Sequence, residues 1–343
     1  MRAIRIHSHG GPDVLQYDSI DEPLCPPDKV KVQIKAAALN HLDLWIRQGL
    51  PGFSLPLPLV MGSDGAGIIT EVGSEVKDLQ SGDKVVIQPN LFCGHCPQCV
   101  QNRENFCTSY GILGETQDGV QCEYIVLSPE NIYPAADHLT FSEAASMPLV
   151  FLTAYQMLVT RARIQAGETV LVYGATSGVG SAGIQIAKQA GCIVLTTVGH
   201  PDKIDYALSL GADHVVDHCS TDWVSKIKRI TGRPGVQVVF EHIGAATWES
   251  SMRLLGFGGR LVTCGATTGA EANIQLQHLF FKQQTLMGST MSDYGTFKEV
   301  MTKINAGIYK PFVDQVFLFS EVVKAHQRLE DRHQFGKIVL IPE

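Results

Sequence analysis

Short runs of valine and isoleucine, separated by glycine, proline and aspartate, dominate the first third of the chain. They fall at residues 3–7, 31–39, 65–73 and 83–89. β-Branched residues in short runs between turn-forming residues predict strands. Because no long helical pattern interrupts these runs, the first part of the chain is expected to be β-rich.

From about residue 168 the pattern changes, and strand-like runs alternate with helical stretches. The expected strands are residues 169–174, 192–198, 214–218, 236–244 and 260–265, and the expected helices are 181–191, 201–212, 222–231 and 246–256. Such alternation predicts a parallel sheet with helices on both faces. The end of the chain returns to a strand at 312–319, a helix at 321–333 and a strand at 337–342.

The length of 343 residues favours two domains. We predict an α/β chain in which a β-rich domain, residues 1–128 and 307–343, is split by a doubly wound parallel-sheet domain, residues 129–306.

Composition narrows the functional classes. Hydrophobic residues make up 45% and charged residues 18%, as in an ordinary globular protein. The net charge of -7 without a basic cluster argues against nucleic acid as a partner. No apolar run reaches the roughly 18 residues of a membrane span, and the N-terminus alternates like a strand. A cytoplasmic protein with neither signal peptide nor membrane anchor is expected.

Four of the nine cysteines, Cys93, Cys96, Cys99 and Cys107, stand close together. Two-residue spacings let thiolates from one tight turn reach the same ion, and a longer loop returns the fourth thiolate to complete a tetrahedron. Four sulfur ligands leave no coordination position for substrate. We therefore predict one structural Zn²⁺ in a lobe of about residues 90–110.

Other interpretations of the cysteines stay open at this point. Thiolates also hold iron–sulfur clusters, although four cysteines within one loop of a β-rich domain favour zinc. Buried, inert cysteines are a second alternative, which their density in a polar loop disfavours. His95 lies inside the cluster and is expected to be an exposed loop residue, because four thiolates already suffice.

A glycine-rich segment, Gly174 to Gly180, joins a predicted buried strand to a predicted helix. In this context the glycines match the dinucleotide-binding fingerprint. Gly174 permits the tight turn, Gly178 lets the backbone approach a pyrophosphate, and Gly180 lets the helix pack closely on the strand. The helix N-terminus then faces negative charge. A loop with incidental glycines is the alternative.

The end of the next strand, near residues 197–203, bears on the choice of cofactor. Enzymes that use NAD usually place an acid at this strand tip to bond the ribose hydroxyls. Here Asp202 comes later, in the first turn of the following helix, and Lys203 can supply positive charge to a 2′-phosphate. We predict NADPH, with a merely solvated Lys203 as the alternative.

Residues 38–43, 62–67, 152–155 and 336–337 add to the cysteine lobe and the glycine turn. Together these segments, spread along nearly the whole chain, resemble the medium-chain dehydrogenase/reductase superfamily, and within it the quinone-oxidoreductase-like branch. The resemblance implies a GroES-like β-rich domain around a Rossmann domain, in agreement with the split that the pattern predicts.

Zinc alcohol dehydrogenases of this superfamily hold a catalytic metal by a cysteine, a histidine and a third cysteine or acid. By the resemblance, Asn40, Ser63 and the neighbourhood of Thr153 stand at these positions. Asparagine and serine are poor zinc ligands, so the resemblance implies that the catalytic zinc is absent. Asp64 and His41 leave open a rearranged metal site.

The resemblance also implies roles for single residues. Asn40 is expected to face the nicotinamide region and to polarise the acceptor oxygen of the substrate. Lys203, His218 and Arg332 match positions near the 2′-phosphate or adenosine in relatives, with a surface histidine as the alternative at His218. The other residues expected to contact the cofactor are Thr153, Gly178, Val179, Gly180, Cys264, Gly265 and Ala266.

Without a Lewis acid, oxidation of simple alcohols loses its main way of stabilising an alkoxide. A quinone or an α,β-unsaturated carbonyl instead spreads the incoming charge by conjugation. We therefore expect NADPH-dependent reduction of such a small molecule. A zinc-dependent alcohol dehydrogenase with a rearranged metal site, a 2-enoyl thioester reductase and a non-catalytic NADPH-binding protein stay open. The thioester branch usually has a tyrosine after the Asn-x-x-Asp segment, and residues 44–51 contain none.

Three further expectations concern packing and assembly. Asp43 and Arg47 are expected to form an ion pair on one helical turn. Kinship implies a homodimer, with a tetramer as the alternative. The substrate site is expected to be apolar and to include Trp45, Leu50, Phe53, Phe280 and Phe281.

Overall fold

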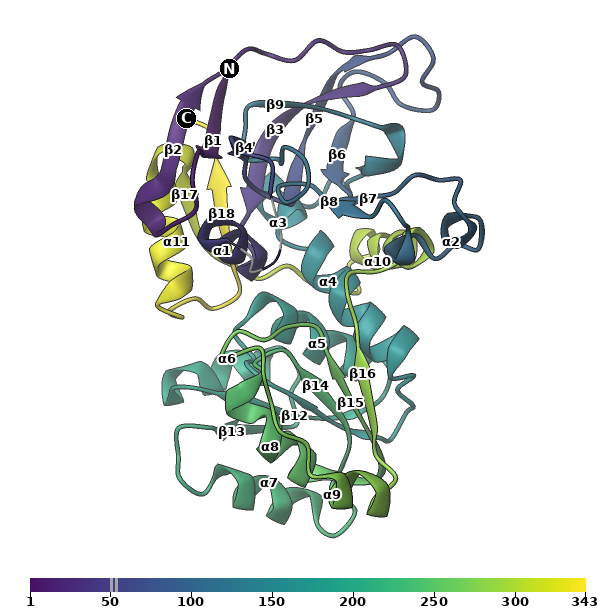
Figure 1. Ribbon diagram of the computed structural model, residues 1–343, viewed down its shortest axis with the longest axis vertical. Coiled ribbons are helices and arrows are strands. Elements are labelled where there is room, and N and C mark those ends of the chain that lie inside the picture. The colour runs from purple at the N-terminus through teal and green to yellow at the C-terminus, as the bar shows by residue number, and fades with distance from the viewer. Residues whose placement is uncertain (50–51, 53–54) are drawn as a thin grey trace. The chain divides into compact units, whose positions relative to one another are not determined.

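The computed structural model describes residues 1–49, 52 and 55–343, which form two compact units (Figure 1). The first unit comprises residues 1–149 and 293–343, and the second comprises residues 150–292. A β-rich unit is therefore interrupted in sequence by a unit of alternating strands and helices, as the pattern predicts. Leu50 and Phe53, two of the residues expected at the substrate site, lie outside the described residues.

The first unit extends further along the chain than the expected domain boundaries at 128/129 and 306/307. Helix α10, Tyr294–Asn305, belongs to this unit because it packs beside strand β10, Ile132–Pro134. The rings of Tyr133 and Phe297 meet edge to face with centroids 5.6 Å apart. The Oδ1 atom of Asn305 accepts a hydrogen bond of 3.1 Å from the backbone N–H of Ala136.

The described residues of the first unit form three sheets. A seven-stranded sheet has the order β10-β6-β5-β3-β18-β17, with β9 also paired to β3; a smaller sheet has the order β2-β1-β4, and β7 pairs with β8. The strands are β1 Arg2–Ile6, β2 Leu15–Ser19, β3 Val30–Ala38, β4 Leu59–Val60, β5 Asp64–Val72, β6 Lys84–Ile87, β7 Asn90–Leu91, β8 Gly111–Ile112, β9 Tyr124–Leu127, β10 Ile132–Pro134, β17 Val313–Leu318 and β18 Lys337–Ile341.

The long strand β3 organises this unit. Its first residues alternate between buried and partly exposed positions, as expected for a strand with one face on a core. At its end three successive alanines are fully buried, and there β18 joins it from the C-terminal part of the chain, with Val339 opposite Ala38. The helices around these sheets are α1 His41–Gln48, α2 Pro97–Val100, α3 Phe141–Ala145, α10 Tyr294–Asn305 and α11 Val322–Glu330.

The second unit is a six-stranded parallel sheet with the order β13-β12-β11-β14-β15-β16. In sequence numbering this is the 3-2-1-4-5-6 order of a Rossmann sheet. The strands are β11 Thr169–Val172, β12 Ile193–Val198, β13 His214–Asp217, β14 Val236–Glu241, β15 Leu255–Thr263 and β16 Thr285–Gly288. The helices are α5 Gly178–Gln189, α6 Ile204–Ser209, α7 Trp223–Thr231, α8 Ala245–Leu254 and α9 Leu276–Phe281. Helix α4, Pro148–Tyr155, spans the junction between the units along the chain.

The central strands of this sheet are buried on both faces. Val170, Leu171 and Val172 of β11 have no exposed surface, and neither do Val238 and Val239 of β14. Such continuous apolar runs are characteristic of parallel sheets covered by helices on both sides. In the described parts of the chain, no helix is both long and apolar enough to span a membrane.

Candidate functional site

The four clustered cysteines converge on one point. Their sulfur atoms all lie within 4.8 Å of one another, and four of the pairs are 3.6 to 4.0 Å apart. Zinc–sulfur bonds of about 2.3 Å in a tetrahedron place the sulfurs about 3.8 Å apart. The thiols are free rather than joined in disulfides. Within the described residues, this is the only group of three or more cysteine, histidine or carboxylate ligands close enough to share an ion.

Backbone N–H groups direct positive charge at the sulfurs. The Sγ atom of Cys107 accepts from the backbone of Cys93 and Ser109 at 3.4 and 3.3 Å. Hydrogen bonds from the backbone N–H groups of Cys99 and Thr108 lower the pKa of Cys96 to about 5.

Burial has the opposite effect on the pKa of Cys99. Together with the hydrogen bond to Cys96, burial raises this pKa to about 12. A bound cation would favour the ionised form of all four thiols. His95 is exposed and its Nδ1 hydrogen-bonds to the carbonyl oxygen of Cys93 at 2.7 Å, so the cluster does not use it as a ligand.

The elements around the sulfurs are short. Helix α2 begins immediately after Cys96, and a 3₁₀ turn at Glu104–Phe106 leads to Cys107. Phe92 and Tyr110, both partly buried, add apolar packing beside the cysteines. This loop has little hydrophobic core of its own, so a metal at the sulfurs would be its main support.

The glycine-rich turn lies between β11 and α5, in the context that the fingerprint requires. Gly174 has a φ of 62°, a left-handed conformation that favours glycine. A Cβ at Gly180 would lie 2.2 Å from the carbonyl oxygen of Gly174, so the start of the helix can pack this closely only with glycine there. Ser177 caps the helix through a 2.9 Å hydrogen bond from the backbone N–H of Gly180 to its Oγ.

Gly178 and Val179 begin α5, and their N–H groups precede the first intrahelical hydrogen bonds. Such groups at a helix N-terminus, with the positive end of the helix dipole, can bind a pyrophosphate. The turn therefore fits a dinucleotide.

The other residues expected near the cofactor in the second unit lie mostly at the same, carboxyl edge of the parallel sheet. His218 follows β13 and its N–H donates to the carbonyl of Val198, the last residue of β12. A Cβ at Gly199 would lie 3.2 Å from the His218 ring, so the ring covers the end of β12. Lys203 ends the 3₁₀ turn that follows, Pro201–Lys203.

Cys264, Gly265 and Ala266 form the segment after β15. The N–H of Cys264 donates to the carbonyl of Glu241 at 3.2 Å, which ties this segment to the end of β14. Thr153 is buried in α4, and its hydroxyl lies 3.9 Å from the sulfur of Met291. Arg332 follows α11 in the first unit, whereas the residues expected to accompany it, Lys203 and His218, belong to the second.

Asn40 lies in a buried polar cluster of the first unit, between β3 and α1. Its Nδ2 donates to Oδ2 of Asp64 at 3.0 Å, and its Oδ1 accepts from the ammonium of Lys337. That ammonium also lies 3.0 Å from Oδ2 of Asp64. Asp64 completes its bonding through Oδ1, which accepts from the backbone N–H of Leu149 at 2.9 Å. At most 6% of each of Asn40, Asp64 and Lys337 is exposed.

The expected ion pair between Asp43 and Arg47 is wrong. Asp43 caps α1 by accepting a 2.7 Å hydrogen bond from the backbone N–H of Asn40, and burial raises its pKa to about 7. Arg47, fully buried, donates to Glu330 and to the carbonyl of Gly10 instead. Among the described residues no ion pair joins Asp43 to Arg47, because both side chains find partners beyond the helix.

The structure also describes Ser63, which stands where zinc alcohol dehydrogenases have a metal ligand, and His41, a possible ligand of a rearranged metal site. Ser63 is buried and its hydroxyl donates to the carbonyl of Leu113 at 2.8 Å. The ring of His41 lies beside that of Trp45, with centroids 6.2 Å apart. Phe280 and Phe281 lie on α9 and are each 69% exposed.

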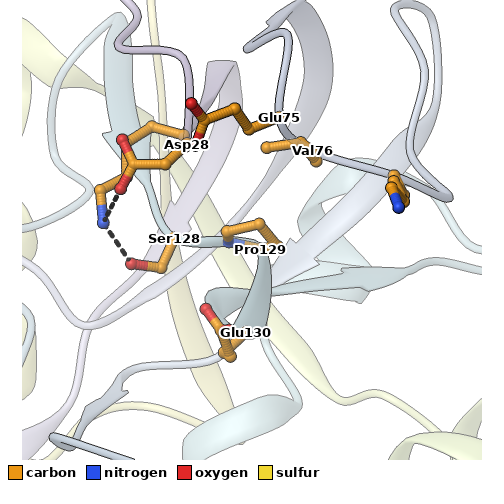
Figure 2. Close-up of a pocket in the computed structure, with 8 residues that line it drawn as sticks. Asp28, Glu75, Val76, Ser128, Pro129 and Glu130 are labelled. Carbon is orange, nitrogen blue, oxygen red and sulfur yellow. Dashed lines mark hydrogen bonds and ion pairs between the residues drawn. The ribbon is translucent and has the colours of Figure 1, made fainter.

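A hollow of about 440 Å³ on the first unit lies apart from the candidate residues, and none of them lines it (Figure 2). Within it the ammonium of Lys29 lies 2.8 Å from the hydroxyl of Ser128 and 3.4 Å from the carboxylate of Asp28. The remaining lining residues are Glu75, Val76, Lys77, Pro129 and Glu130.

Lys337 and Asp64 were not predicted from the sequence as partners of Asn40. Lys337 contributed to the resemblance only as part of the Gly336–Lys337 pair, and Asp64 entered only as a possible metal ligand. The sequence offered one signal, the predicted strand that begins at Lys337. In the structure this strand, β18, pairs with the end of β3, two residues before Asn40. That pairing, however, links residues almost 300 positions apart.

Comparison with known proteins agrees with this architecture. The family described as Zinc-binding dehydrogenase matches residues 178–306, and the one described as Alcohol dehydrogenase GroES-like domain matches residues 26–137. A quinone oxidoreductase of Rattus norvegicus is 30% identical, covering 99% of this chain and 98% of its own. A crotonyl-CoA carboxylase/reductase of Cereibacter sphaeroides is 29% identical, covering 99% and 86%.

Among solved structures, one described as an NAD-dependent alcohol dehydrogenase is 41% identical with a TM-score of 0.96, and 99% of each chain is covered. The predicted combination of a GroES-like domain and a Rossmann domain is thereby confirmed. With this identity over nearly its whole length, the chain belongs to the medium-chain dehydrogenase/reductase superfamily of oxidoreductases.

Proposed function

We propose that this oxidoreductase uses NADPH to reduce a quinone or an α,β-unsaturated carbonyl compound without a catalytic metal. The observation that carries the proposal is the bonding of Asn40, whose amide is held by Lys337 and Asp64. An amide N–H can donate to the oxygen on which negative charge develops during hydride transfer. Conjugation in the acceptor carries the rest of that charge.

The same cluster disfavours a metal at Asn40. The carboxylate of Asp64, the strongest potential metal ligand there, already accepts from the ammonium of Lys337 and from the amide of Asn40. A divalent ion at this carboxylate would have to take the place of the ammonium as its partner. The ion and the ammonium would then lie close together in a buried environment, where like charges repel strongly.

Most of the residues that would hold the nucleotide belong to the second unit. NADPH, when bound, supplies the hydride. The N–H groups of Gly178 and Val179 would bind the pyrophosphate, and Gly180 keeps the turn close to the strand. We propose that Lys203, His218 and Arg332 recognise the 2′-phosphate or the adenosine. Thr153, Cys264, Gly265 and Ala266 would contact the remainder of the cofactor.

The cysteine cluster would hold one structural Zn²⁺. The sulfur spacing and the four thiol ligands fit a closed tetrahedral site, with no position left for a substrate. Zinc here would hold residues 93–107 together and would take no part in hydride transfer.

A second function has specific support. The relative described as an NAD-dependent alcohol dehydrogenase favours NADH and an alcohol substrate. This alternative requires a rearranged metal site near Asp64 and His41.

The crotonyl-CoA carboxylase/reductase favours a third function, reduction of a 2-enoyl thioester. The absence of a tyrosine from residues 44–51 argues against it.

The proposal is tested by measuring oxidation of NADPH and NADH with quinones, enones and a 2-enoyl thioester, and reduction of NADP⁺ and NAD⁺ with alcohols. We expect the highest kcat/KM with NADPH and a quinone or enone, and weaker binding of NADH by calorimetry. Alcohol oxidation that disappears on chelation while the fold persists would support the zinc enzyme. Cofactor binding without turnover of any substrate would support a non-catalytic binding protein.

We also propose that the second unit pairs with a second copy of the chain. Strand β16 ends the six-stranded sheet, and an edge strand offers unpaired backbone groups to another chain. Phe257 and Phe281, with ring centroids 5.9 Å apart, lie near it on β15 and α9 and are each more than 60% exposed. A homodimer should sediment as two chains. Phe281→Asp should shift it toward the monomer, whereas Leu208→Asp on α6 should not.

A further inference from the structure

Lys337 is placed beside Asn40 by the backbone of the first unit. The N–H of Leu39 donates to the carbonyl of Ile338 at 2.9 Å, and β18 continues antiparallel to β3 from there. Lys337 therefore begins β18 at the level where Asn40 caps the start of α1. Its side chain is only 5% exposed, and its ammonium donates to Asn40 and to Asp64.

The donors and acceptors in this cluster fix the orientation of the Asn40 amide. An ammonium group has only donors, so it must face the Oδ1 atom of Asn40. A carboxylate has only acceptors, so Asp64 must face the Nδ2 atom. With Oδ1 bound to Lys337 and one Nδ2 hydrogen bound to Asp64, the amide retains one N–H for another group.

We propose that Lys337 is a positioning residue for the reaction, which holds Asn40 so that it presents an N–H group, and not its carbonyl, to the acceptor oxygen of the substrate. The positive charge of the Lys337 ammonium, which donates to Oδ1, also polarises the amide and makes the remaining N–H a stronger donor. This inference rests on the proposed role of Asn40 in reduction of a quinone or enone. It adds the residue that determines what Asn40 can offer.

Replacement of Lys337 should lower turnover of the acceptor without weakening NADPH binding. Lys337→Met removes the donor to Oδ1 and leaves the buried amide free to rotate. We expect kcat for the acceptor to fall about 10- to 100-fold, the range for loss of a charge-assisted hydrogen bond. The dissociation constant of NADPH should change by less than about twofold, because the predicted pyrophosphate and 2′-phosphate contacts are unchanged.

A double-mutant cycle separates positioning from a general structural role. If Lys337 acts through Asn40, Lys337→Met should change kcat by less than about twofold in an Asn40→Ala background. Independent, multiplying losses would overturn the inference, as would a kcat of Lys337→Met within twofold of the parent. Lys29→Met, which removes a lysine of the same unit from outside the cluster, is the matched control.

Stability needs its own control, because Lys337→Met leaves the charge of Asp64 buried and unpaired. The double variant Lys337→Met/Asp64→Asn removes both charges and keeps an amide beside Asn40. We expect it to fold like the parent by circular dichroism and to keep the low kcat. Recovery of parental kcat in this double variant would show that the charge of Lys337 is not needed, and would overturn the inference.

A readout without turnover distinguishes failure of this inference from failure of the proposed function. In protein labelled with ¹⁵N-asparagine, the Nδ2 signals of Asn40 are identified by their loss in Asn40→Ala. We expect them to exchange slowly with solvent in the parent and at least about tenfold faster in Lys337→Met, because the amide loses its anchor. If no quinone or enone is reduced, the proposed function fails, and this exchange rate alone decides whether Lys337 fixes the amide. Equal exchange in the two proteins would overturn the inference.

Discussion

Replacement of Cys99 by serine should open the cysteine loop while leaving the rest of the protein folded. Phe92 and Tyr110 are the partly buried aromatic side chains packed on this cluster. Each contributes at most about 3 kcal/mol, or about 6 kcal/mol together. A structural zinc site contributes about 10 kcal/mol or more at neutral pH. A zinc ion bound by the four cysteines would therefore stabilise the loop more than the aromatic packing does, even if its four ligands contribute unequally.

The expected loss follows from this comparison. A site with three thiolates and a water keeps part of its affinity, so we expect the free energy of local opening to fall by at least about 4 kcal/mol. Because every 1.4 kcal/mol is tenfold, the backbone amides of residues 93–107 should exchange about a thousandfold faster. The parallel sheet of the second unit, which has its own core, should keep its protection.

Hydrogen exchange followed by mass spectrometry, with metal analysis on the same preparations, tests this expectation. Cys25→Ser, which changes a cysteine of the same unit outside the cluster, should retain both the zinc and the slow exchange. If Cys99→Ser lacks zinc and yet protects residues 93–107 as the parent does, the metal is not the main support of the loop. A well-folded parent protein without zinc would lead to the same conclusion.

Three further substitutions test other parts of the structure. Gly180→Ala places a Cβ 2.2 Å from the carbonyl oxygen of Gly174. It should weaken NADPH binding at least about tenfold and lower the free energy of unfolding by about 1–3 kcal/mol. An unchanged NADPH affinity in calorimetry would contradict this. The pKa of Asp43 is raised from 3.8 to about 7, mainly by burial, so the folded state binds its proton more tightly. Its contribution to the free energy of unfolding should therefore rise as pH falls from about 7 to 4, by at most about 1.4 kcal/mol per pH unit. Parallel curves of unfolding free energy against pH for the parent and Asp43→Asn would refute this. Arg47→Met should lower the free energy of unfolding, measured by urea denaturation, by about 2–3 kcal/mol. This is less than the loss on breaking a fully buried ion pair, because Glu330 is 29% exposed. A loss below about 0.5 kcal/mol would contradict the expectation.

The fold was predictable where local patterns carry the information. The alternation of β-branched runs and amphipathic stretches located the strands from β11 to β14 to within about three residues. Strand β15 was placed too late, because it begins at Leu255, inside the stretch expected to be helical. The weakly patterned strand β16 was not predicted. Nor did the sequence show that α10 packs on the first unit, because that packing depends on long-range contacts such as Tyr133 with Phe297.

The candidate site divides in the same way. Cys93 to Cys107 and Gly174 to Gly180 are close in sequence, so their spacing predicts their convergence. The partners of Asn40 come from two other strands, and only the antiparallel pairing of β18 with β3 brings Lys337 to it. Helix spacing was misleading for Asp43, because a backbone N–H at the helix start and a buried environment replaced the expected partner.

We propose that hydride transfer takes place at Asn40 without a metal, while the chain binds zinc only through its cysteines. The most direct test measures zinc content and single-turnover oxidation of NADPH by a quinone or enone on the same preparation. We predict one zinc per chain, zero after the cysteine site is removed, and a burst of NADPH oxidation by the one-zinc protein that Asn40→Ala slows at least about tenfold. Two zinc ions per chain, with alcohol oxidation that depends on the second, would contradict the account.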